Sequence, residues 1–205
     1  MSIQAIIFDL GGVLLRTADF GPRERLAARL GRTRFELEEL VFGGQSGMAA
    51  QRGEISMQQH WEHVRQALGL GEAEFELFQQ EFWSQDAMDY TLVEAIRKLR
   101  SRCRTALLSN NFPNLRRLLA ERWPVADAFD ELIISSEIGI MKPDPRIYQI
   151  ALERLAVLPA EAVFVDDFLH NVEGARGVGM HAIHFRSPAQ AFAELETLLA
   201  GQANL

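Results

Sequence analysis

The run Ile6-Ile7-Phe8-Asp9-Leu10-Gly11-Gly12-Val13 decides the fold of this chain. It overlaps a short apolar segment, residues 3–10, which contains Asp9 near its end and is followed by Gly11 and Gly12. The length of this segment and its isoleucine content favour a β-strand that is buried on both faces. Ligands of open α/β sheets bind outside the carboxyl ends of the strands. We therefore expect Asp9 at a functional edge of the sheet, although an aspartate at a strand end is often only a turn residue.

Similar apolar runs recur along the chain and alternate with segments of helical periodicity. The further runs are residues 105–109, 132–135, 162–165 and 181–185, and the clearest helical patterns between them are residues 92–99 and 147–155. Pro143 and Pro145 lie where the first turn of the second helix would accept a missing N–H. Strands that alternate with helices predict right-handed βαβ units. The expected fold class is therefore α/β, a Rossmann-like, doubly wound and mostly parallel sheet.

One stretch breaks this alternation. Between about residues 17 and 87 the sequence shows no convincing strand, only helical patterns at residues 23–30, 35–41, 57–68 and 75–82. This stretch is far longer than the usual two to six residues of a strand-to-helix connection. We expect a helical cap domain of residues 16–87 inserted into a core of residues 1–15 and 88–205. The aromatic residues of the helical patterns should form its core, and residues 43–47, rich in glycine, suggest a mobile loop facing the sheet.

Polar side chains follow two of the other predicted strands. Ser109, Asn110 and Asn111 come at the end of one strand, where a hydroxyl and backbone N–H groups suit a phosphoryl oxygen; a plain N-cap is the alternative. Asp166 and Asp167 end another strand. Two adjacent carboxylates repel each other and suit a hard cation such as Mg²⁺, and without a counter-ion they would be costly.

The order of these residues decides between the alternatives. Lys142, taken alone, would be read as a solvent-exposed lysine before a proline. Along the chain, however, a strand-end Asp is followed by a strand-end Ser, then by this Lys, and then by a strand-end Asp pair. In this order the chain resembles the haloacid dehalogenase superfamily over nearly its whole length. The stretches that carry the resemblance are residues 6–13, Leu107-Leu108-Ser109-Asn110, Met141-Lys142-Pro143 and residues 164–171. Residues 52–56 and 142–148 look closest to small bacterial members that act on sugar phosphates.

The resemblance implies a Mg²⁺-dependent phosphohydrolase in which Asp9 forms an aspartyl-phosphate that water then hydrolyses. The residues implied in the site fall into three groups. Asp9, Gly11 through its carbonyl, and Asp167 would hold the metal, with Asp166 counted in the same set because it would orient the metal shell together with Asn171. Ser109 and Asn110 would bind the phosphoryl group, and Lys142 would neutralise charge on it and on Asp9. Arg16 and Arg52 are candidates for binding the rest of a small phosphorylated metabolite.

Gly11 departs from the family pattern. Phosphatases of this family usually carry a second aspartate there, as general acid for the leaving group and general base for water. Positioned acid–base catalysis is typically worth roughly 10²- to 10⁴-fold in rate. We therefore expect a preference for good leaving groups, such as anomeric or acyl phosphates. His170 is a possible substitute proton donor, because histidine titrates near neutral pH; a solvent-facing loop histidine is the simpler expectation.

Composition and charge argue against several classes of function. The chain of 205 residues is 48% hydrophobic and has a net charge of −7, which argues against nucleic acid as a partner. A single cysteine, Cys103, excludes an internal disulfide, and no apolar run reaches the roughly 18 residues of a membrane span. We expect a cytoplasmic monomer or homodimer with no membrane partner. Two alternatives stay open: a phosphate-binding protein without turnover, and a metal-free haloacid dehalogenase.

Overall fold

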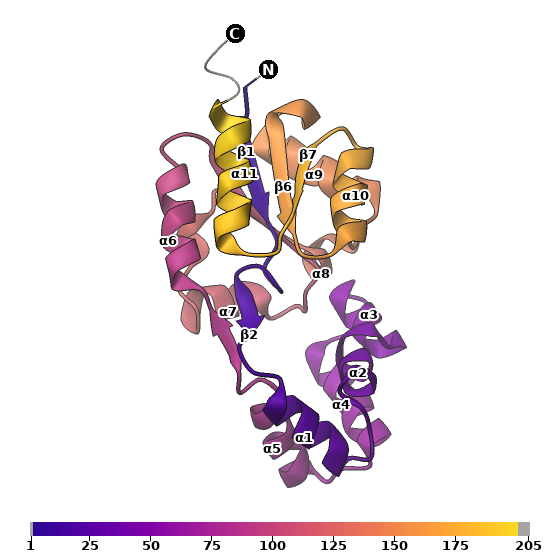
Figure 1. Cartoon of the computed structure of the whole chain (residues 1–205). Helices are drawn as coiled ribbons and strands as arrows, with labels where there is room; N and C mark the ends of the chain where they lie inside the picture. Colours follow the sequence, from indigo (N-terminus) through magenta and orange to yellow (C-terminus); the bar gives the residue numbers. More distant parts are fainter. Residues whose placement is uncertain (1, 201–205) are drawn as a thin grey trace.

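The computed structural model describes residues 2–200, and its centre is a five-stranded parallel sheet (Figure 1). Strand order across the sheet is β5-β4-β1-β6-β7. The strands are β1 (Ala5–Phe8), β4 (Arg104–Ser109), β5 (Glu131–Ile134), β6 (Ala162–Asp166) and β7 (His181–His184). These are the five strands that the sequence predicts, each within two residues of the expected bounds at either end. The Rossmann-like α/β fold is thereby confirmed.

Alternate residues of each strand face two separate hydrophobic layers. In β1, Ile6 and Phe8 pack on one side of the sheet, and Ala5 and Ile7 on the other. The first layer is covered by the helices α6 (Tyr90–Leu99), α7 (Leu115–Glu121) and α11 (Pro188–Ala200), and the second by α9 (Pro145–Leu155) and α10 (Leu169–Gly177). Because both faces are covered, the strands read as continuous apolar runs rather than alternating ones.

The position of β1 fixes the place of the site. From β1 the chain goes first to β4 and β5 on one side and later to β6 and β7 on the other, so the topological switch point lies at the carboxyl end of β1. Asp9 follows β1 directly, and its N–H donates to the carbonyl of Val165 in β6 at 2.9 Å. The chain folding therefore places Asp9 between the ends of β4 and β6.

The stretch between β1 and α6 forms a group of helices with a hydrophobic core of its own, below the sheet in Figure 1. Its helices are α1 (Gly21–Arg29), α2 (Arg34–Glu38), a π-helical turn (Glu39–Gly43), α3 (Gln45–Gln51), α4 (Met57–Leu68) and α5 (Glu72–Phe82). Its core contains Phe75, Phe78 and Phe82, with Trp61 packed against them, as the helical spacing predicts. We refer to residues 16–87 as the insert.

Three expectations for this region and its surroundings are wrong. Two short strands, β2 (Leu15–Thr17) and β3 (Asp86–Met88), form an antiparallel ribbon where no strand was expected, because three residues are too few to show a period. The glycine-rich stretch is not a loop: residues 43–47 end the π-helical turn and begin α3, where a Cβ on Gly47 would meet the carbonyl oxygens of Val41 and Phe42 at 2.8 Å. Only Pro145 is in the first turn of α9, since Pro143 precedes that helix.

The expected boundaries of the insert, residues 16 and 87, fall inside the ribbon of β2 and β3. The division into a core of residues 1–15 and 88–205 and a cap of residues 16–87 stays a prediction. Among residues 2–200, no helix combines the length and the apolar character needed to cross a bilayer.

Candidate active site

Lys142 joins two carboxylates at the carboxyl ends of the central strands. Its Nζ lies 2.8 Å from Oδ1 of Asp9 and 2.7 Å from Oδ2 of Asp166. All three side chains are buried, and Lys142 is only 4% exposed. The reading of Lys142 as a solvent-facing lysine is therefore wrong. Buried charges persist when they are paired in good geometry, so the ammonium and the two carboxylates stabilise one another.

The electrostatic balance at Asp9 is unfavourable to its charged form. Burial raises the pKa of Asp9 to about 7, and the charges of Asp166 and Asp167 add to this rise, while Lys142 opposes it. The pKa of Lys142 is raised, although burial alone would lower it, because Asp9 and Asp166 are so close. The site thus carries more negative charge than Lys142 alone neutralises, which favours the binding of a cation.

Asp167 completes a cluster of three carboxylates. One oxygen from each of Asp9, Asp166 and Asp167 lies within 4.8 Å of the others. Burial, followed by the charge of Asp166, raises the pKa of Asp167 to about 6. Its Oδ1 is buried and has no hydrogen-bond partner among residues 2–200. An orphaned buried carboxylate oxygen in an acidic cluster is a donor set that suits a hard cation such as Mg²⁺.

Asp166 differs from its neighbour because protein donors occupy its oxygens. Besides Lys142, it accepts the N–H of Phe168 at 2.8 Å and the side-chain amide of Asn171 at 3.1 Å. The backbone carbonyl of Asn171 in turn accepts a hydrogen bond from the hydroxyl of Tyr148 at 2.8 Å. These contacts favour an orienting role for Asp166, rather than direct contact with a metal ion.

Ser109 and Asn110 lie at the end of β4, beside β1. Ser109 is 1% exposed, and its hydroxyl makes no hydrogen bond within the described part of the chain. Asn110 uses both ends of its amide on the backbone of Lys142: Nδ2 donates to the carbonyl at 2.9 Å, and Oδ1 accepts the N–H at 2.8 Å. The side chain of Asn110 therefore positions Lys142, which leaves Ser109 as the polar side chain available to a ligand at this strand end.

The remaining candidates are not brought into this cluster by any contact. Arg16 binds the carboxylate of Asp89 and the carbonyl of Val13, and Arg52 forms a two-pronged ion pair with Glu54. His170 is exposed in the first turn of α10. Cys103 is buried, and burial raises the pKa of its thiol to about 11, in keeping with no chemical role.

Comparison with known proteins agrees with this arrangement. Residues 3–179 match the family model described as haloacid dehalogenase-like hydrolase. The chain belongs to this family. The expected resemblance is thereby confirmed, and the cluster of Asp9, Lys142, Asp166 and Asp167 lies within the matched residues.

Three relatives illustrate the similarity. The bifunctional epoxide hydrolase 2 of Sus scrofa is 30% identical over 226 residues, which span 98% of this chain and 40% of the relative. The sesquiterpene phosphatase astK of Aspergillus oryzae is 26% identical, and the match spans 97% of both chains. A family enzyme of Bacteroides thetaiotaomicron, crystallised with magnesium and inorganic phosphate, superposes with a TM-score of 0.76 over 90% of this chain and 95% of that one, at 22% identity. The chain spans less than half the length of the larger curated relatives that it matches.

The closeness of Gly12 to Asp167 was not foreseen from the sequence. The φ of Gly12 is +72°, and a Cβ there would lie 2.0 Å from Oδ2 of Asp167. We expect Gly12→Ala to displace the Asp167 carboxylate and to weaken Mg²⁺ binding about 10- to 100-fold, the range seen when the support of a ligand is lost. Titration calorimetry with Mg²⁺ measures this effect.

Gly31→Ala is the matched control for this substitution. Gly31 has a φ of +65°, but a Cβ there meets nothing within 4 Å among the described residues. It should lower the melting temperature through the same backbone strain and leave the Mg²⁺ affinity as it is. Equal Mg²⁺ affinities for Gly12→Ala and the wild type would show that Gly12 does not support Asp167.

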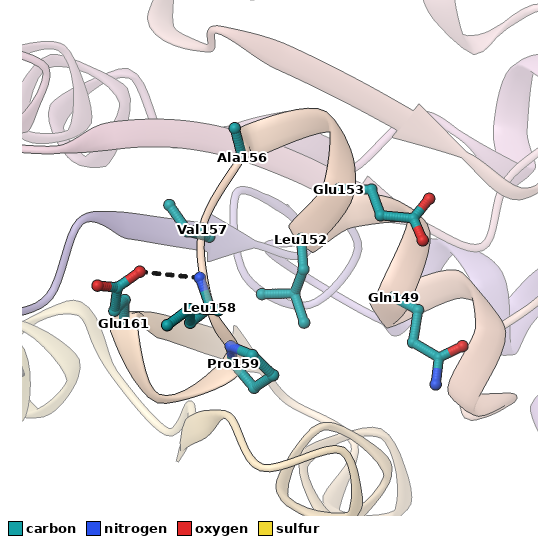
Figure 2. A pocket seen from close by; sticks show the side chains of 8 residues that line it. All are labelled: Gln149, Leu152, Glu153, Ala156, Val157, Leu158, Pro159 and Glu161. Atoms are coloured by element: carbon teal, nitrogen blue, oxygen red, sulfur yellow. Dashed lines mark hydrogen bonds between the residues drawn. The ribbon is translucent and has the colours of Figure 1, made fainter.

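A shallow hollow of about 390 Å³ lies elsewhere on the protein (Figure 2). Its lining runs from the end of α9 to the turn before β6 and includes Leu152, Leu158 and Pro159. The backbone N–H of Leu158 donates to the Glu161 carboxylate within the turn that lines the hollow. This hollow is at the amino end of β6, so the sheet separates it from Asp9, and it does not belong to the candidate active site.

Proposed function

We propose that this hydrolase cleaves small phosphate monoesters through an aspartyl-phosphate on Asp9. The observation that carries the proposal is the position of Lys142, which bridges Asp9 and Asp166 at the switch point of the sheet. Lys142 holds Oδ1 of Asp9, while Oδ2 has no hydrogen-bond partner within residues 2–200. One carboxylate oxygen is thus fixed and the other is available as a nucleophile.

The reaction proceeds in two displacements at phosphorus. Oδ2 of Asp9 forms a bond to phosphorus while the ester P–O bond breaks, and the leaving oxygen takes a proton. Water then attacks the phosphorus of the aspartyl-phosphate, which releases inorganic phosphate and regenerates the Asp9 carboxylate. Lys142 neutralises charge on both Asp9 and the phosphoryl group, and the Ser109 hydroxyl donates to a phosphoryl oxygen.

The residues present fit a Mg²⁺ ion. Asp9, Asp167 and the carbonyl of Gly11 would hold it, since Asp167 Oδ1 is orphaned and the Gly11 carbonyl accepts no hydrogen bond among residues 2–200. Asp166 and Asn171 would orient this set. When bound, the ion offsets the repulsion between the anionic nucleophile and the phosphate.

The leaving group decides which substrates suit the site. With Gly11 in place of an acidic side chain, no carboxylic acid at this position protonates the departing oxygen. We propose anomeric, acyl or similarly activated phosphates of small, sugar-like metabolites as the preferred class, with water supplying the proton. Arg16 and Arg52 are each paired with a carboxylate, and a role of either residue in substrate binding stays a prediction. The exposed His170 makes no contact that places it at Asp9.

Gly11 also favours a second candidate, a protein that binds phosphate and Mg²⁺ without turnover. The dehalogenase alternative is less compatible, because a metal-free mechanism has no use for three clustered carboxylates. A panel of sugar, acyl, nucleotide and alkyl phosphates, assayed with Mg²⁺ and with EDTA, separates the three. We expect Mg²⁺-dependent phosphate release that EDTA abolishes. Phosphate binding without release would favour the binding protein, and EDTA-resistant halide release from a 2-haloacid would favour the dehalogenase.

A further inference from the structure

The hydroxyl of Ser135 connects the insert to the loop that follows β4. Ser135 is the first residue of the short helix α8 (Ser135–Ile138) and is fully buried. Its Oγ donates to the carbonyl of Gln51, in α3 of the insert, at 2.6 Å. The same oxygen accepts the backbone N–H of Asn111 at 2.9 Å. One buried hydroxyl therefore joins three segments that are far apart in sequence.

The loop after β4 is held at every residue from Asn110 to Phe112. The side-chain amide of Asn110 is hydrogen-bonded to the backbone of Lys142, and the N–H of Asn111 donates to the hydroxyl of Ser135. The ring of Phe112 is 6% exposed and lies among aromatic rings of the insert, 5.3 Å from His60 and 6.3 Å from Phe42 between centroids. A displacement of the insert would therefore move the loop at Phe112 directly and at Asn111 through Ser135, three and two residues after Ser109.

Beside the Ser135 contact, the backbone at Gly53 lies very close to the backbone of Ser136. Gly53 follows α3 with a φ of +69°, and a Cβ there would lie 2.2 Å from the carbonyl oxygen of Ser136. The end of α3 can reach α8 only because residue 53 has no side chain. The insert is thus seated on the core by a contact that any larger residue would disrupt.

We propose that Ser135 is a positioning residue that couples the seating of the insert to the phosphate site. Through Asn111 it holds the loop that directly follows Ser109. Through the adjacent Asn110, this loop holds Lys142. The site then binds phosphate tightly only while the insert is seated on α8. This coupling rests on the proposed function for its catalytic meaning, but it is testable by binding alone.

The first test compares Ser135→Ala with Ser136→Ala. Ser136 is a matched control because its buried hydroxyl has no hydrogen-bond partner among the described residues. We expect Ser135→Ala to raise the Kd for inorganic phosphate, measured by calorimetry in Mg²⁺, about tenfold, since two buried partners lose the hydroxyl. The Kd for Mg²⁺ should change less than twofold, and kcat/KM should fall with phosphate affinity. Ser136→Ala should match the wild type in all three.

The second test disturbs the same contact from the insert. Gly53→Ala should weaken phosphate binding as Ser135→Ala does. The Kd of the double variant for phosphate should be no higher than the higher of the two single-variant Kd values. Gly69→Ala is the control, because Gly69 has a φ of +66° and a Cβ there would meet nothing within 4 Å among the described residues. It should lower thermal stability only.

The outcomes separate the coupling from the proposed function. A lower melting temperature for Ser135→Ala with an unchanged Kd for phosphate would overturn the coupling, as would effects of Ser135→Ala and Gly53→Ala that multiply in the double variant. A wild-type protein that binds phosphate but releases none from any ester would refute the phosphatase, while the Kd values would still test the coupling.

Discussion

Replacing Asp9 with asparagine should abolish phosphate release, with a loss of at least about 10⁴-fold in kcat. Asparagine has nearly the shape of aspartate, but its amide does not attack phosphorus. The fold should persist, because Lys142 keeps its contact with Asp166 and the substitution removes one of three clustered negative charges. Initial rates on the best ester of the substrate panel, with circular dichroism as the measure of folding, test this prediction.

A trapping experiment adds a direct readout. Acid quenching of the wild type during turnover should leave a phosphoryl group on the peptide that contains Asp9, and mass spectrometry should find none on that peptide in Asp9→Asn. Asp127→Asn serves as the control, because Asp127 is an exposed surface carboxylate paired with Arg97. Residual activity of Asp9→Asn within tenfold of the wild type would exclude Asp9 as the nucleophile.

Replacing Gly11 with aspartate should raise activity on alkyl phosphates by about 10² to 10⁴-fold, the usual contribution of positioned acid–base catalysis. The structure has room for the side chain: a Cβ at Gly11 meets nothing within 4 Å among residues 2–200, and Gly11 is not among the glycines with positive φ. The gain should be smaller on aryl phosphates, whose leaving groups need less protonation. Values of kcat/KM for one alkyl and one aryl phosphate measure the difference.

Gly11→Asn separates the effect of the new carboxylic acid from the effect of a larger side chain. Asparagine fills the same space without an exchangeable carboxylic proton, so it should give no gain on either substrate. The aspartate variant should also show one further titrating group in the pH dependence of kcat, which neither the wild type nor the asparagine variant shows. Equal activity of the two variants, or no gain with aspartate, would show that the missing acid does not limit this hydrolase.

The sequence predicted the sheet well because its strands are local features. Each strand of the core is a short apolar run bounded by polar or glycine residues, and this pattern needs no knowledge of the neighbouring strands. The ribbon of β2 and β3 was missed for the opposite reason: Arg16 and Thr17 form a strand only because Asp86 and Ala87 lie beside them. The start of α3 was missed because glycines are read as loop residues, whereas packing against the π-helical turn requires Gly47.

The sequence predicted which residues belong to the candidate site, but not which contacts they make with one another. The order of Asp9, Ser109, Lys142 and the Asp166-Asp167 pair carried the resemblance that brought these residues together. No sequence pattern showed that the side chain of Asn110 would bind the backbone of Lys142, or that Arg16 would pair with Asp89. Such details depend on side chains that meet only after the elements pack.

By itself, the sequence determined the α/β fold, the placement of acidic residues at strand ends and the presence of a helical insert, because apolar periodicity and strand-end chemistry are written within short segments. Only the tertiary structure decided which polar groups are buried together. Lys142 meets Asp166 across 24 positions, and Ser135 meets Gln51 across 84. Lys142, which reads as exposed, is buried, and Gly12, which reads as a turn residue, leaves room for the Asp167 carboxylate, because packing brings distant charges and backbone within contact distance.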